Sequence, residues 1–561
     1  MHQRILVMGG TGVFGKRLCR HLASFEEVEL IVSSRTSGKA EVFVEELMAN
    51  AQNLRVQGIA LDNGKNLVTQ LAVIRPFAVI DCSGPFQGAN YDVARAILNA
   101  GAHLIDLADA RDYLASFSME LDAIARLNGV SASTGASSSP ALSSSVVDEI
   151  TRDWQRIDTI DICITPGGKS EVGQSVIEAI MSYAGKKIPM WQDGKLGQTT
   201  GWKGVSDVNM PNLGRRRVAA VETFDAESLG VRHGVQSRVS FSAGLESPIE
   251  QRGIEAIATL LKYNLFPNPK SLIPLLLKAR QFTRIFSSDE GGMLVKVRGI
   301  DAAGHLMQTT WSLVAKNDHG PYIPILPAAA TLQKLLKNDV SIGAYPANKN
   351  IILSDILAQM APYDITSQTE LSPAASSCFE TYLGPKAFQT LPVGLQEFHS
   401  QACPPIWSGE ADIARDRGLV LSFLGWLFGL PDIGVSVPLT VSVDRTFSKT
   451  GRSIERWTRT FGGKKMSSLL CHEADGSFVE IFSPFTFILA LSSDECGIKM
   501  PVSGWKIGKI PLPKFLAPRS ETAEFQDDLG RFRFDVRLTV PFFGLLAHYR
   551  GWLVPSLTKQ S

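Results

Sequence analysis

A glycine-rich turn near the start of the chain limits most strongly how the chain can fold. The turn reads Gly9, Gly10, Thr11, Gly12, Val13, Phe14 and Gly15. An apolar run at residues 4–8 precedes it, and apolar residues at helical spacing follow it. Glycines here permit a tight turn and let a diphosphate approach the backbone, while the helix N-terminus offers free N–H groups. The order of strand, turn and helix therefore predicts a dinucleotide-binding site.

The second apolar run, residues 29–32, indicates which dinucleotide is bound. It ends in Ser33, Ser34 and Arg35, without an acidic residue. A site for NAD usually has Asp or Glu about 20 residues after the glycines, to bind the ribose 2′-hydroxyl. Arg35 can instead pair with a 2′-phosphate, and Lys39 adds a second cation a turn later. We therefore expect NADP(H) as the cofactor.

Strand-like and helix-like patterns alternate over residues 1–150, which predicts a parallel sheet covered by helices on both faces. Ligands of such sheets bind at the carboxyl ends of the strands. Asp62 follows the third strand, where it can accept from the adenine amino group or cap the next helix. The turn after the fourth strand is expected to border the ribose and nicotinamide; it comprises Cys82, Ser83, Gly84 and Pro85.

The rest of the 561-residue chain indicates two further domains. Residues 151–360 read as α+β, with an antiparallel sheet that walls a substrate cleft and a helix at 325–336 that packs back on the first domain. Ser, Thr, Gln and Pro cluster at 362–375, where a linker is expected. Residues 385–555 show short strands between turns. The expected fold class is α/β: an N-terminal Rossmann-type doubly wound parallel sheet, a second α+β domain and a C-terminal antiparallel β-rich domain.

Several residues are candidates for chemistry at the expected nicotinamide position. Hydride transfer needs a correctly held substrate and a source of protons. Tyr91, Asp106 and Asp109 can donate a proton or hold a polar substrate group, or they can be helix-start packing, a strand-end cap and a helix N-cap, respectively. The arginines at 215–217 form either a solvated face or an anion clamp, and His319 either a turn or an acid–base group.

Bulk properties exclude other classes of protein. The formal net charge of +1 argues against a nucleic-acid-binding protein, and seven scattered cysteines without a Cys-x-x-Cys pair argue against disulfides or a metal site. No secretion signal is evident, so we expect a cytoplasmic protein. The apolar run at 419–431 is too short to span a membrane. We interpret it as a buried core segment, with peripheral membrane contact as the alternative.

Several stretches of the chain together match one family. They are the glycine turn and residues 33–35, 79–86, 103–109, 319–324 and 343–346. Through them, residues 1–350 resemble the saccharopine dehydrogenase-like oxidoreductases. The stretches at 455–463, 511–513 and 548–553 make residues 385–555 resemble a C-terminal domain of unknown function that is attached to such reductases.

The resemblance implies NADP-dependent hydride transfer to or from a C=N, C=C or C=O group of a small molecule, amino-acid-derived or lipid-like. Two alternatives stay open. One is a reductase of a lipid or carrier-bound acyl substrate, and the other is a non-catalytic NADP(H)-binding protein. The sequence also leaves open whether the protein is a homodimer.

Overall fold

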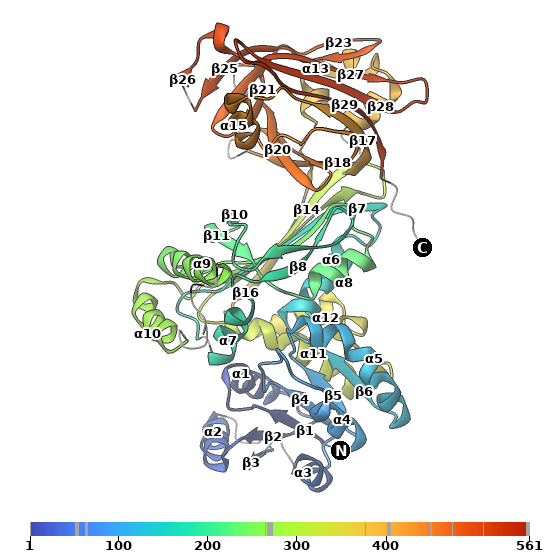
Figure 1. The fold of residues 1–561 in the computed structure, drawn as a ribbon. Helices are drawn as coiled ribbons and strands as arrows, with labels where there is room; N and C mark the ends of the chain where they lie inside the picture. The colour runs from blue at the N-terminus through green and yellow to red at the C-terminus, as the bar shows by residue number, and fades with distance from the viewer. Residues whose placement is uncertain are drawn as a thin grey trace. The chain divides into compact units, whose positions relative to one another are not determined.

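The computed structural model describes residues 2–50, 55–61, 66–171, 173–263, 265, 273–375, 377–400, 406–448, 452–473, 475–508 and 510–556 (Figure 1). The chain forms two compact units. The first comprises Met1–Arg152, Thr159–Val297 and Thr309–Glu370, and the second comprises Asp153–Asp158, Arg298–Gln308 and Leu371–Ser561. Asp62 lies outside the described residues, so its role stays a prediction.

The first unit contains a seven-stranded parallel sheet in the order β3-β2-β1-β4-β5-β6-β15. Its central strands are almost completely buried, as expected for a sheet with helices on both faces. The order confirms the predicted Rossmann-type sheet. The strands are β1 (Gln3–Met8), β2 (Val28–Ser34), β3 (Val56–Ala60), β4 (Ala78–Asp81), β5 (His103–Asp106), β6 (Ser131–Thr134) and β15 (Gly343–Pro346).

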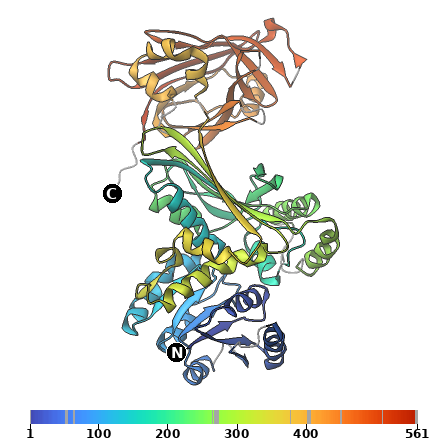
Figure 2. The same ribbon diagram turned by 180° about the vertical axis from the view of Figure 1, so that it is seen from behind.

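Helices cover both faces of this sheet. On one face, α1 (Val13–Leu22) contacts α11 (Leu326–Leu336), and Arg20 of α1 pairs with Glu46 of α2 (Ser37–Asn50). On the other face, α4 (Asp92–Asn99) packs between α3 (Leu67–Ile74) and α5 (Arg111–Leu127). Figure 2 shows α11 and α12, in yellow, against the blue strands. The predicted return of residues 325–336 to the first domain is therefore confirmed. The other helices of the first unit near this sheet are α6 (Ser143–Ile150) and α12 (Leu353–Met360).

A second sheet follows the order β10-β11-β12-β7-β13-β14-β16, with β8 and β9 joined to β12. Several strand pairs are antiparallel, as expected, but β12 pairs with β7 in parallel, so the sheet is mixed rather than antiparallel throughout. The long connection between these strands, which includes α7 and α8, leaves room for a parallel crossover. The strands are β7 (Arg156–Thr165), β8 (Lys187–Gln192), β9 (Lys195–Thr200), β10 (Ser206–Met210), β11 (Gly214–Ala220), β12 (Arg238–Ala243), β13 (Gly291–Ile300), β14 (Leu306–Ala315) and β16 (Ile365–Pro373).

Three helices beside the second sheet pack on one another through a small apolar cluster. Ile177 and Met181 of α7 (Gln174–Tyr183) meet Ile273 of α10 (Ile273–Thr283), and residues of α9 (Pro248–Lys262) pack against them. A fourth helix, α8 (Asp225–Arg232), contacts β8 and β12.

The expected linker at residues 362–375 is instead largely a strand. Residues 365–373 form β16, at one end of the second sheet's order. Most of its side chains are exposed to solvent. Polar side chains on an edge strand exposed to water are not desolvated, so such a strand can contain Ser, Thr and Gln. Its composition then resembles that of a linker.

The second unit is dominated by an antiparallel sheet in the order β23-β24-β27-β28-β29-β17-β18-β19-β20-β21-β22-β25-β26. This confirms the predicted antiparallel β-rich domain. Helices α13 (Cys378–Gln389), α14 (Val393–His399) and α15 (Leu419–Leu427) accompany it. The strands are β17 (Ile406–Ala414), β18 (Gly434–Phe447), β19 (Ser453–Phe461), β20 (Lys464–His472), β21 (Phe478–Phe482), β22 (Phe485–Leu489), β23 (Ser492–Asp494), β24 (Gly497–Lys499), β25 (Val502–Ile507), β26 (Ile510–Pro511), β27 (Arg519–Gln526), β28 (Phe532–Val540) and β29 (Gly544–Pro555).

The apolar run at 419–431 is not the buried core segment that the sequence suggests. Its first part forms α15, in which Leu419 is 93%, Phe423 59% and Trp426 75% exposed. The apolar residues of this short helix are distributed around its whole circumference, so only some of them can pack against the sheet. Among the described residues, no helix is both long and apolar enough to cross a bilayer.

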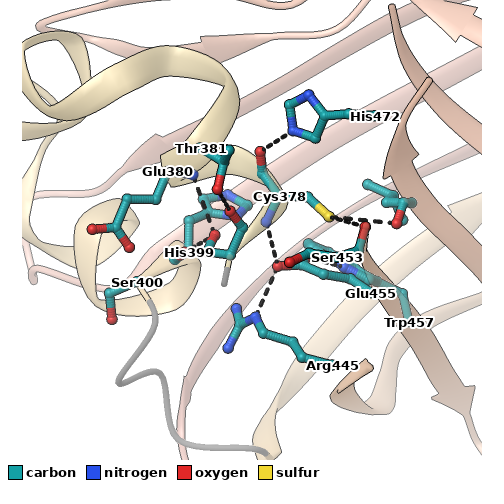
Figure 3. A network of polar contacts seen from close by, with 12 residues as sticks. Cys378, Glu380, Thr381, His399, Ser400, Arg445, Ser453, Glu455, Trp457 and His472 are labelled. Atoms are coloured by element: carbon teal, nitrogen blue, oxygen red, sulfur yellow. Dashed lines mark hydrogen bonds and ion pairs between the residues drawn. The ribbon is translucent and has the colours of Figure 1, made fainter. Parts of the chain in front are cut away.

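A buried carboxylate fixes the start of α13 to the sheet of the second unit (Figure 3). One oxygen of Glu455 accepts from Arg445 Nε at 2.8 Å and from the backbone N–H of Cys378 at 3.0 Å. The other oxygen accepts from Trp457 Nε1 at 2.9 Å. Burial alone would raise the pKa of Glu455, but the Arg445 guanidinium and these donors lower it overall. The carboxylate is therefore fully paired although it is inaccessible to water.

Candidate functional site

The glycine turn forms an open cradle at the end of β1. Gly9 has a φ of +67°, which glycine adopts readily, and the N–H of Gly12 donates to the carbonyl of Gly9 at 2.9 Å. Gly12 also caps α1, without a side chain to occupy the first free N–H groups of the helix. A β-carbon on Gly15 would collide with the carbonyl oxygen of Gly9 and lie 2.7 Å from Cα of Gly10. The turn and helix therefore fit closely together and leave backbone donors for a diphosphate.

The end of β2 offers the predicted cations beside this cradle. The N–H of Gly10 donates to the Ser33 carbonyl at 3.0 Å, which joins the glycine turn to β2. The Ser33 hydroxyl donates to the Val7 carbonyl at 3.1 Å, and Ser34 is buried, so Ser33 already has a structural role. Arg35 and Lys39 are exposed. Their cationic groups are therefore accessible to a phosphate on the ribose.

The turn after β4 lies directly against the glycine turn. A β-carbon on Gly9 would meet the backbone of Cys82 and Ser83 at 3.0 Å. Asp81 holds this turn, because its carboxylate accepts from the N–H of Ser83 at 2.8 Å and from the Ser83 hydroxyl. Burial raises the pKa of the Cys82 thiol, and the nearby Asp81 carboxylate adds to the rise. Cys82 is thus a neutral thiol with little nucleophilic character.

A cavity of about 620 Å³ opens beside these turns. The first domain contributes Phe14 of α1, the turn after β4, the end of β5 and residues 137–139 after β6 to its wall. The second sheet with helices α7, α9 and α10 contributes most of the rest, and residues 320–324, before α11, complete it. Most of the wall is apolar, including Phe86, Ile164, Ile177, Ile180, Phe241, Ile254, Met293 and Ile323. The cavity is therefore bounded by both halves of the first unit, at the edge where parallel sheets bind ligands.

The structure separates the three candidate catalytic residues. Asp109 lines the cavity, and its carboxylate accepts from Gln87 Nε2 at 3.1 Å. Burial raises the pKa of Asp109, and the Gln87 hydrogen bond offsets a part of the rise. The Tyr91 hydroxyl donates to the Tyr113 carbonyl at 2.7 Å, and the two rings stack at 4.7 Å. Neither Tyr91 nor Asp106 belongs to the cavity wall.

Asp106 instead joins the ends of β5 and β6. Its Oδ1 accepts from the N–H groups of Ala108 and Gly135 at 3.0 and 2.9 Å, and from the Thr134 hydroxyl at 2.8 Å. Its Oδ2 is buried and has no hydrogen-bond partner among the described residues. Burial raises the pKa of Asp106 to about 7, despite the three donors.

We expect Asp106 to make folding stability depend on pH. The folded-state pKa of about 7 exceeds the unfolded value of about 3.9, so the folded protein binds the proton more tightly and loses stability as the pH rises from about 4 to 7. The Asp106→Asn variant keeps an acceptor for the three donors and removes the titration. The free energy of unfolding, measured with urea, should fall between pH 5 and pH 8 by about 2–3 kcal/mol more in the unmutated protein than in the variant. The same pH dependence in both proteins would contradict this role.

Other polar groups of the cavity wall have no sequence motif that singles them out. The side-chain oxygens Gln87 Oε1, Thr165 Oγ1, Ser170 Oγ and Thr223 Oγ1 are buried and form no hydrogen bond with other described residues. Glu222 and Tyr183 also line the wall, and burial raises the pKa of each. Unpaired buried polar atoms are costly, so their concentration in this wall indicates a ligand that pairs with some of them.

The arginine run and His319 lie outside this wall. Arg217 forms two 2.9 Å hydrogen bonds with Glu255, Arg215 pairs with Asp207, and Arg216 lies 3.9 Å from Glu246. His319 Nδ1 accepts from the Asp364 N–H at 2.9 Å. The arginines are therefore paired with acidic side chains, and His319 holds a turn.

The sheet order and the glycine cradle define a Rossmann-type dinucleotide-binding domain. Comparison with protein families then identifies its type: residues 5–133 match the saccharopine dehydrogenase NADP binding domain. This confirms the predicted resemblance and NADP(H) as the cofactor of the domain. Residues 391–553 match a domain of unknown function, DUF4166, in agreement with the second predicted resemblance.

Solved structures match the chain at low sequence identity. Apo histidine-tagged saccharopine dehydrogenase (L-Glu forming) from Saccharomyces cerevisiae is 11% identical, with a TM-score of 0.47, and the match covers 66% of this chain and 100% of the other. The WlbA dehydrogenase from Bordetella pertussis, in complex with NADH and UDP-GlcNAcA, is 10% identical, with a TM-score of 0.31 and coverages of 64% and 94%. No curated protein matches the chain.

Proposed function

We propose that the first unit transfers a hydride between NADP(H) and an apolar small molecule bound in the 620 Å³ cavity. The observation that carries the proposal is the position of this cavity. Phe14 of the glycine turn and Cys82, Gly84 and Pro85 of the turn after β4 all belong to its wall. A nicotinamide that enters from the diphosphate cradle would therefore face the cavity, and when bound it supplies or accepts the hydride.

The wall supports a substrate with a hydrocarbon body and one polar group near the reacting carbon. Apolar residues surround most of the volume, whereas Asp109 and Gln87 lie at its edge next to the end of β5. Because its pKa is raised, Asp109 carries a proton nearer to neutral pH than an ordinary carboxyl group and can donate a hydrogen bond. We assign it to hold the carbonyl or imine atom of the substrate. This favours a lipid-like substrate over a highly charged amino-acid derivative.

Turnover of NADPH with apolar enals, enones, aldehydes and imines tests the proposed function directly. We expect oxidation of NADPH with at least one of these classes, and little with charged keto acids. Tight NADPH binding without turnover of any compound would instead support the non-catalytic alternative.

For a substrate that is turned over, Asp109→Ala removes the hydrogen-bonding group and should lower kcat/KM about tenfold, the value of one hydrogen bond to an ionisable group. Asp112→Ala is the matched control, because Asp112 lies three residues away with its side chain 94% exposed. Equal losses in both variants would contradict the role of Asp109, whereas NADPH binding should be unchanged in either.

The exposed Arg35 should determine the preference for NADP(H). Removing the guanidinium in Arg35→Ser should weaken NADPH binding about tenfold, because a charge-assisted contact to phosphate is lost. NADH has no 2′-phosphate, so its affinity serves as the internal control and should stay the same. Fluorescence titration with both cofactors measures the difference. A parallel loss for NADH would show that the variant disturbs the whole site.

A further inference from the structure

The second unit has a cavity of its own, of about 130 Å³. Aromatic rings from separate elements enclose it: Phe461 of β19 meets Tyr549 of β29 at 5.6 Å, and Phe398 of α14 stacks on Phe532 of β28 at 4.0 Å. Strands β19 and β29 are not neighbours in the sheet order, so the sheet curves around the cavity. In another protein, an engineered apolar cavity of about 150 Å³ binds benzene. The volume therefore suits a ligand the size of one aromatic ring.

Two polar groups in this mostly apolar wall, Tyr549 and Glu524, are candidates for pairing with a ligand. Tyr549 is 7% exposed and lines the cavity, yet its hydroxyl forms no hydrogen bond with another described residue. Glu524 also lines the cavity, with one oxygen paired to His399 Nε2 at 2.7 Å. Burial raises the pKa of Tyr549 to about 12, so its hydroxyl keeps its proton. The Tyr549 side chain therefore lines the cavity with a protonated hydroxyl that can pair with a ligand hydroxyl.

The charges of the wall disfavour an anionic ligand. Arg459 is the cation among the described residues that line the cavity, and it is already engaged. Its guanidinium pairs with Glu480 at 3.3 Å, donates to the Ser468 hydroxyl at 2.9 Å and lies over the Trp457 ring at 5.1 Å. Glu524 adds a second carboxyl group to the wall. A ligand carboxylate would thus meet two glutamates and no free cation, which costs free energy in a poorly solvated site.

We propose that the second unit is a binding site for a neutral hydrocarbon that bears one hydroxyl group, about the size of phenol. The ring occupies the apolar part of the cavity, and the hydroxyl pairs with Tyr549 and Glu524. The site is independent of the cofactor and of the proposed reaction of the first unit.

Phenol, benzene, 1-hexanol and hexanoate are the probes, and binding to the full-length protein is measured by titration calorimetry without NADPH. We expect saturable binding of phenol and weaker binding of benzene and 1-hexanol, with no binding of hexanoate at pH 7.5. In Tyr549→Phe, which removes only the hydroxyl, the affinity for phenol should fall about tenfold while that for benzene is unchanged. Tyr382→Phe is the matched control, because Tyr382 packs in the same unit outside the cavity wall.

Each other outcome would overturn a defined part of the proposal. If neither phenol nor 1-hexanol bound saturably to the folded protein, the proposed site would be refuted. Hexanoate binding as tight as that of 1-hexanol would overturn the ligand class. Phenol binding that Tyr549→Phe leaves unchanged, or that Tyr382→Phe weakens equally, would place the ligand elsewhere. Because the glycine turn and this cavity belong to different compact units, NADPH affinity reports separately on the integrity of the first unit.

Discussion

Gly15→Ala should reduce the affinity for NADPH at least 100-fold. A methyl group at this position would strike the carbonyl oxygen of Gly9 and approach Cα of Gly10 to 2.7 Å. Both obstacles are backbone atoms of the cradle itself, so neither can rotate away as a side chain would. The turn must therefore open, which separates the N–H groups that a diphosphate needs together. Titration of intrinsic or NADPH fluorescence measures the loss.

Gly38→Ala separates this effect from the general cost of replacing a glycine. Gly38 lies in α2, close to the expected ribose position, and an added β-carbon there meets no atom within 4 Å. We expect that variant to bind NADPH as the unmutated protein does. If Gly15→Ala bound the cofactor normally, the diphosphate would not sit in this cradle.

The second large effect concerns folding of the C-terminal unit. Glu455→Ala should lower its free energy of unfolding by about 3–5 kcal/mol, because the buried Arg445 guanidinium loses its carboxylate partner. The indole N–H of Trp457 and the backbone N–H of Cys378 also lose their acceptor. Urea unfolding followed by tryptophan fluorescence measures the change, and the loss of the capping contact should free the start of α13.

Glu521→Ala is the control for this variant, since Glu521 lies in β27 with its side chain 76% exposed. Its removal should change stability by less than about 1 kcal/mol. NADPH affinity provides a second control, because the cradle belongs to the first unit. An equally stable Glu455→Ala protein would show that the network in Figure 3 contributes specificity of packing but little net stability.

Local signals were sufficient to predict most of the first sheet, whereas the second sheet depends on distant pairing. Six strands of the first sheet alternate with helix patterns within residues 1–150, so the sequence locates them. The seventh, β15, comes from residues 343–346, and the sequence pattern does not predict it as a strand. Strand β16 is polar because its side chains are exposed, and only its place beside β14 distinguishes it from a linker. In the same way, the exposed side chains of α15 have the composition of a core helix. Composition predicts an element only through its expected burial. The prediction therefore fails for a strand that is exposed to water and for an apolar helix that is not covered.

The candidate site shows the same division. The cradle and Arg35 lie within the first 35 residues, so their spacing indicated the cofactor. Asp106 and Asp109 are three residues apart and chemically identical, and only the fold shows that one is enclosed by donors and the other borders the cavity. Tyr183, Glu222 and Thr223 reach the wall from the second half of the first unit. No sequence motif identifies these three residues, because only the tertiary structure brings them together.

Because Gly9 has no side chain, the backbone of the glycine turn can lie directly against the backbone of the turn after β4. The segment expected to hold the diphosphate and the one that borders the 620 Å³ cavity are thus in close backbone contact, between Gly9 and Cys82–Ser83. We expect cofactor binding to order both segments, so that this edge of the cavity is fixed before a substrate binds. Such coupling would favour ordered binding, with NADP(H) first, over random binding.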